Sequence, residues 1–164
     1  MRLRVLLVAV SVLFLSGPAW AQTDIFGGYS FLSVDFDSGD RETVHGWMAN
    51  VSGGVADHIG IVGDVSGFYE DGTSVYTYMG GLRYNVGTNG VNPFAQALFG
   101  GARIGDSTFS ENGTAMGFGG GVDIPIADRV SVRAVQFDWV PVRFVGEWFT
   151  NNVRLGWGIV FRIP

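Results

Sequence analysis

The sequence predicts an all-β protein, an eight-stranded antiparallel up-and-down transmembrane β-barrel. Seven turn-rich clusters divide the chain after residue 21 into eight segments rich in Val, Ile, Tyr, Phe and Gly. In several segments apolar side chains alternate with small or polar ones, which is the two-residue period of a strand. Hydrophobic residues make up 47% of the chain and charged residues 15%. Beyond the first residues, however, no run of about 18 apolar residues could form a membrane helix.

The first 21 residues are typical of an export signal. A positively charged start precedes an apolar stretch too short to span a bilayer, and an Ala-Trp-Ala cleavage motif ends at Ala21. We expect residues 1–21 to be a bacterial signal peptide and residues 22–164 to form one barrel domain. Cleavage would leave eight basic residues, all arginine, against fifteen acidic ones, a net charge of −7 that disfavours nucleic-acid binding. The chain has no cysteine, which excludes thiol chemistry.

The seven breaks predict where the eight strands end. They lie at residues 37–42, 56–58, 70–74, 87–90, 105–113, 127–129 and 141–147. The first, third, fifth and seventh breaks are longer on average, whereas the second and sixth are tight turns. Outer-membrane barrels carry long loops on the outside and short turns on the periplasmic side, so this alternation supports a membrane barrel and orients it.

In most of the predicted strands one face is apolar, and we expect that face to contact lipid; the segments at residues 24–36 and 91–103 do not alternate clearly. The opposite face consists mainly of Gly, Ser, Thr, Asn and Gln with isolated charges, which suits a narrow lumen better than the surface of a soluble barrel. Large aromatic side chains would also crowd the interior of an eight-stranded barrel. In the last segment we expect odd-numbered residues from Phe149 to Ile163 to face lipid. The predicted lipid-facing aromatic girdle comprises Trp47, Tyr76, Tyr84, Trp139, Phe149, Trp157 and Phe161.

The polar face supplies a predicted network inside the barrel. An eight-stranded lumen is filled by its own side chains, and a buried charge needs a partner. We therefore expect ion pairs and hydrogen bonds that stabilise the barrel rather than an ion pathway. The predicted members of this network are Asn50, Asp64, Arg83, Gln96, Asp123, Gln136, Asp138 and Arg154.

Arg133 departs from the alternating pattern. It shares parity with Val135 and Phe137, so a regular strand would direct it at lipid. An arginine there costs roughly 2–4 kcal/mol at the bilayer midplane and about 0–1 kcal/mol near the interface. Two interpretations stay open: the side chain reaches to the interface, or a β-bulge turns it inward.

Four stretches of the chain resemble the OmpA-like outer-membrane β-barrel, porin-like family. They are FGGYSFL (Phe26–Leu32), NPFAQALFGGAR (Asn92–Arg103), GFGGGVDIPIADRVSVRAVQFDW (Gly117–Trp139) and VRLGWGIVFR (Val153–Arg162). The resemblance covers the transmembrane barrel domain. It implies a bacterial outer-membrane location, contact with outer-membrane lipid and lipopolysaccharide, and assembly by the barrel-assembly machinery. The chain departs from the family in that residues 162–164 follow the last aromatic residue, and no peptidoglycan-binding domain is expected.

The predicted function is that of a small structural or surface protein that supports envelope integrity, with a plugged lumen and external loops available for adhesion. A narrow diffusion porin and a soluble exported ligand-binding barrel are the alternatives. We predict no enzyme, because His45 and His58 are the only histidines and neither accompanies a nucleophile motif. The glycines at 117–121 lack the context of a dinucleotide fingerprint, and the acidic loops are expected to be solvated, so no cofactor and no metal are predicted.

Overall fold

The computed structural model describes residues 22–35, 41–70, 72–87, 90–106, 108 and 110–163. The predicted signal peptide lies outside these residues. In the described ranges every regular element is a strand, and there is no helix long and apolar enough to cross a membrane.

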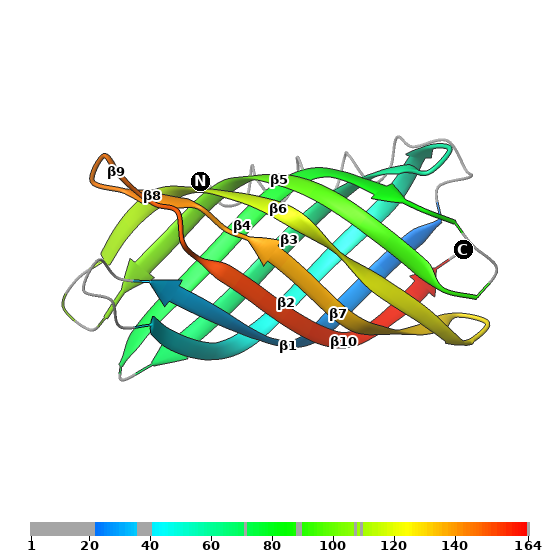
Figure 1. Cartoon of the computed structure of the whole chain (residues 1–164), viewed down its shortest axis with the longest axis horizontal. Helices are drawn as coiled ribbons and strands as arrows, with labels where there is room; N and C mark the ends of the chain where they lie inside the picture. The colour runs from blue at the N-terminus through cyan, green and yellow to red at the C-terminus, as the bar shows by residue number, and fades with distance from the viewer. Residues whose placement is uncertain are drawn as a thin grey trace, which may run out of the picture.

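Eight long strands form a closed antiparallel ring, as the sequence predicts (Figure 1). Their order around the ring is β5, β4, β3, β2, β1, β10, β7, β6, and pairing of β5 with β6 closes it. The strands are β1 (Thr23–Asp35), β2 (Arg41–Ala56), β3 (Ile59–Glu70), β4 (Thr73–Asn85), β5 (Asn92–Gly105), β6 (Ser110–Ala127), β7 (Val130–Trp139) and β10 (Val153–Ile163). Each strand pairs with two neighbours, so the long strands leave no free sheet edge. The all-β, eight-stranded fold class is confirmed.

Two connections differ from the predicted pattern. The third connection contains only positions 71 and 72, where Gly72 adopts a φ of +85° that favours glycine in a tight turn. The predicted loop at 141–147 is instead a β-hairpin of β8 (Val142–Phe144) and β9 (Glu147–Phe149). Strand β8 pairs with β6, so the hairpin extends the barrel wall. It lies at the end of the barrel opposite the C-terminus (Figure 1). We assign the hairpin end to the outside, since the connection from β7 to β10 that carries the hairpin is the longest, whereas β2–β3 and β6–β7 at the other end are joined by the short turns 57–58 and 128–129.

The distribution of polarity is the reverse of that in a soluble protein. Large apolar side chains are exposed on the outside of the ring: Tyr78 is 51%, Leu82 57% and Phe99 61% exposed. By contrast, Asp138 and Arg154 are 0% and 1% exposed. An apolar belt of this kind is stable when hydrocarbon rather than water surrounds it. The soluble-barrel alternative does not fit this arrangement.

Six of the seven aromatic residues predicted to face lipid are exposed in the structure. They are Trp47, Tyr76, Tyr84, Trp139, Trp157 and Phe161. The prediction for Phe149 is wrong. Phe149 lies in β9, is half-buried and lines a cavity at the hairpin end of the barrel. The last long strand begins only at Val153, so the parity of β10 does not extend back to Phe149.

Phe99 offers a direct test of the lipid-facing surface because it lies near the middle of β5. We expect Phe99→Arg to lower the free energy of unfolding by about 2–4 kcal/mol in lipid vesicles, since a charge at the midplane must be desolvated. Urea titration of the folded fraction measures this change. Val145→Arg is the matched control, because Val145 is 84% exposed at the tip of the hairpin. Equal stabilities of the two variants would contradict a bilayer around β5.

Candidate functional site

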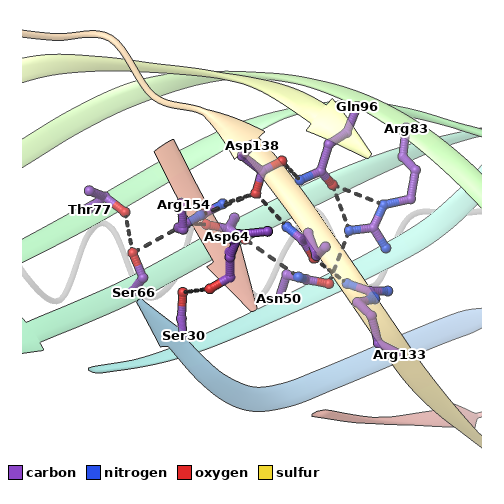
Figure 2. A network of polar contacts seen from close by, with 12 residues as sticks. Ser30, Asn50, Asp64, Ser66, Thr77, Arg83, Gln96, Arg133, Asp138 and Arg154 are labelled. Atoms are coloured by element: carbon purple, nitrogen blue, oxygen red, sulfur yellow. Dashed lines mark hydrogen bonds and ion pairs between the residues drawn. The ribbon is translucent and has the colours of Figure 1, made fainter. Parts of the chain in front are cut away.

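The polar core is centred on Arg154, which extends from β10 into the lumen (Figure 2). Its Nη1 lies 2.7 Å from Asp64 Oδ1 on β3, and its Nη2 lies 2.7 Å from Asp138 Oδ2 on β7. Nη1 also donates to Ser66 Oγ at 3.2 Å. These contacts join strands on different sides of the ring, so a single guanidinium ties the barrel wall together across its interior.

Asp138 extends this network toward the periplasmic end. Its carboxylate accepts hydrogen bonds from Gln96 Nε2 at 2.9 Å and Gln136 Nε2 at 2.7 Å. Gln96 Oε1 in turn accepts from Arg83 Nη2 at 2.8 Å. Arg83 also donates to Asn50 Oδ1 and Ser52 Oγ, both at 3.2 Å. The hydrogen bonds therefore form a continuous chain through the lumen (Figure 2).

A β-bulge turns Arg133 inward, which is the second of the two interpretations of this residue. Against both neighbours of β7, the register shifts by one residue next to Arg133, and Ala134 and Val135 are both exposed. Arg133 is consequently 0% exposed and pairs with Asp123, at 2.7 Å from Nε to Oδ1 and 2.9 Å from Nη2 to Oδ2. Its Nη1 donates to Gln136 Oε1 at 2.7 Å. The bulge thus removes a cation from the lipid face and supplies Asp123 with its counter-ion.

Two buried phenylalanine rings pack against the arginines in the lumen. The Cζ atoms of Arg83 and Arg133 lie 4.3 Å and 4.4 Å from the centroid of the Phe94 ring. Arg133 also lies 4.3 Å from the centroid of Phe26. Cation–π contacts of this geometry stabilise a desolvated guanidinium. The predicted network did not include Phe26, Phe94 or Arg133. Phe94 shares the strand parity of Gln96, which was predicted to point inward, whereas the inward direction of Arg133 depends on the bulge.

The eight residues predicted to form the polar network all point into the lumen. Asn50, Asp64, Arg83, Gln96, Gln136, Asp138 and Arg154 are buried, and Asp123 keeps 14% of its side chain exposed. With Arg133, three arginines face three aspartates, so the core carries no net charge. Glycine is required beside it: a Cβ on Gly119 would lie 2.5 Å from Asp138 Oδ1 and would also contact the Phe137 carbonyl oxygen. Small residues on β6 therefore make room for the charged side chains.

The two histidines lie outside the polar core. His45 is exposed, and its Nδ1 lies 2.7 Å from the Tyr29 hydroxyl. His58 occupies the turn between β2 and β3, where its ring stacks on Tyr84. Within the described residues, no group of three His, Cys, Asp or Glu side chains is placed to hold a metal ion.

The fold matches solved bacterial barrel structures. At 12% identity, Neisserial surface protein A (NspA) aligns with 86% of this chain and 97% of its own, with a TM-score of 0.74. Ail, the attachment invasion locus protein of Yersinia pestis, aligns at 14% identity with 87% of this chain, 99% of its own and a TM-score of 0.59. The N-terminal β-barrel domain of Pseudomonas aeruginosa OprF gives 13% identity, 87% and 97% coverage and a TM-score of 0.61. No protein-family model and no curated protein matches the chain by sequence.

These similarities and the arrangement of side chains define the class of protein. The chain has the fold of the eight-stranded β-barrels of the bacterial outer membrane. The predicted resemblance to OmpA-like barrels is confirmed at the level of the fold, which is the level that identities of 12–14% support.

Arg154→Met tests the structural role of the polar core. The change leaves Asp64 and Asp138 buried without their cation, and we expect a loss of about 3–5 kcal/mol in unfolding free energy. Urea unfolding in lipid vesicles measures this loss. Heat-modifiable migration on a gel reports the folded fraction at each urea concentration. Arg129→Met is the control, because Arg129 is an exposed turn residue. A loss below about 1 kcal/mol for Arg154→Met would show that the ion pairs do not stabilise the barrel.

Proposed function

We propose that the chain is a structural and surface protein of the bacterial outer membrane whose lumen does not conduct ions. The observation that carries the proposal is the pairing of Arg154 with Asp64 and Asp138 across the lumen, at 2.7 Å on each side. A conducting pore needs polar groups that water or ions can reach, whereas these groups are desolvated and bonded to one another. Among the buried side chains that the structure describes, only one polar atom, Asn152 Oδ1, has no hydrogen-bond partner.

The external end supports the surface part of the proposal. The β8–β9 hairpin presents Val145 and Trp148 to the surroundings, at 84% and 44% exposure. One structural neighbour is named as a surface protein and another as an attachment and invasion protein. By analogy, the external connections are the part of this chain that would contact another cell or molecule. The apolar belt would contact outer-membrane lipid and lipopolysaccharide, and the barrel-assembly machinery would insert the chain.

We also infer that the protein is not an enzyme. The structural neighbours described above are non-enzymatic outer-membrane barrel proteins. In this chain His45 contacts Tyr29 and His58 stacks on Tyr84, so both histidines make aromatic contacts at the barrel surface. The charged residues of the lumen are saturated with mutual contacts, which suits a stabilising role better than proton transfer.

Dye uptake by whole cells tests the envelope role. In a strain that lacks the protein, we expect faster uptake of a hydrophobic dye, because the outer membrane loses one of its stabilising barrels. Plasmid-borne wild-type protein should restore slow uptake, and Arg154→Met should restore it less well at equal expression. Val145→Asp, at the exposed hairpin tip, is the control that should restore slow uptake fully.

Two outcomes would contradict the proposal. Unchanged dye uptake in the strain that lacks the protein would exclude an envelope role. Stable single channels from the purified wild-type protein in planar bilayers would show an open lumen, and the narrow diffusion porin would then replace the sealed barrel.

A further inference from the structure

A second feature of the lumen is an apolar cavity of about 320 Å³ at the hairpin end of the barrel. Its walls include Leu32 on β1, Val75 on β4 and Ile104 on β5. The hairpin region adds Val140, Val142, Phe144, Val145 and Phe149. The volume lies at the lower end of the roughly 300–1,000 Å³ that small-molecule sites occupy. The cavity is lined mainly by apolar side chains, unlike the charged core formed around Arg154.

The β8–β9 hairpin forms one wall of this cavity and is held in place by the barrel. Val142 pairs with Ala115 of β6, and Arg143 pairs with Thr114. Val142 and Phe144 also pack against a buried apolar cluster that includes Met79, Leu98 and Ala102. The wall is therefore anchored by backbone pairing and by apolar contacts, which gives the cavity a defined shape.

Asn152, one of the residues that line the cavity, carries a buried polar atom without a hydrogen-bond partner. Asn152 is 2% exposed, and its Nδ2 donates to the carbonyl oxygens of Val140 at 3.2 Å and Phe149 at 3.1 Å. These two acceptors fix the orientation of the amide, because a flipped amide would place oxygen against oxygen. Asn152 Oδ1 accepts no hydrogen bond from the protein. A buried acceptor without a donor is costly, so a ligand that donates a hydrogen bond here would be favoured.

The described residues that line the cavity carry charge of one sign. Among the described lining residues, the charged ones are Glu111 on β6, which is half-buried, and Glu147 on β9, which is exposed. Two carboxylates favour a cationic ligand and repel an anionic one. An ionised carboxylate ligand would also have no proton to donate to Asn152 Oδ1.

We propose that this cavity binds a small apolar molecule with an amine at one end. The apolar body fills the space lined by Leu32, Val75 and Phe149, and the ammonium donates to Asn152 Oδ1. Glu111 and Glu147 supply the opposite charge. This assignment is independent of the envelope role proposed for the barrel, because it rests on the cavity alone.

Three probes with the same apolar body test the proposal: 4-phenylbutylamine, 4-phenylbutan-1-ol and 4-phenylbutanoate. Calorimetric titration of the whole barrel in lipid nanodiscs measures their affinities, with empty nanodiscs as the blank. We expect the amine to bind at least about tenfold more tightly than the carboxylate, with the alcohol between them. The double variant Glu111→Gln/Glu147→Gln should lower the affinity for the amine by about tenfold and leave the affinity for the alcohol unchanged.

Further variants separate a specific site from general partitioning. Asn152→Ala should weaken the binding of both the amine and the alcohol, since both ligands donate a hydrogen bond to the Oδ1 atom that this substitution removes. Val75→Trp should abolish binding of all probes by filling the cavity. Glu70→Gln is the control, because Glu70 is an exposed carboxylate at the same end of the barrel that is not part of the lining. Heat-modifiable migration verifies that each variant is folded.

The proposal is overturned by any of three results with folded protein. The first is binding no greater than to empty nanodiscs. The second is binding that Val75→Trp does not reduce. The third is equal affinity for the amine and the carboxylate, which would show that the two glutamates do not select the ligand.

Discussion

The structure depends on one constraint: every backbone N–H and C=O group must find its partner within the ring, because hydrocarbon outside supplies none. Pairing of β5 with β6 satisfies this constraint by removing the last free edge. Closure with eight strands then leaves an interior just wide enough for side chains. The outer face must be apolar, and the inner face must fill a narrow space with groups that satisfy one another. The reversed distribution of polarity follows from these two requirements.

The interior meets its requirement with charges that balance in number. Arg154 joins Asp64 and Asp138, and Arg133 joins Asp123. Arg83 has no direct carboxylate contact among the described ion pairs, and amide and hydroxyl oxygens with the Phe94 ring hold it instead. Buried ion pairs are stable only when such additional contacts complete them. Toward the hairpin end the lining becomes apolar, and Asn152 is the polar residue that this change leaves with an open acceptor.

Much of the arrangement is predictable from the sequence because the strand period is local. Strand parity, together with the assignment of the apolar face to lipid, placed Asp64, Arg83 and Arg154 on the inner face. Arg133 and Phe149 could not be assigned in this way. The inward turn of Arg133 requires an extra residue in β7 relative to both neighbouring strands, and the burial of Phe149 requires pairing of β8 with β6. Both are properties of strands distant in sequence, so no local pattern reveals them.

Spin labels on single cysteines measure the sidedness of the barrel most directly, and the chain contains no cysteine that would interfere. Labels would be placed at Tyr78 and Phe99, on adjacent strands of the proposed lipid face, in protein reconstituted into vesicles. Collision of these labels with oxygen, which concentrates in hydrocarbon, should be frequent, and collision with a water-soluble nickel complex should be rare. Frequent collision with nickel and rare collision with oxygen at both positions would mean that water surrounds the ring.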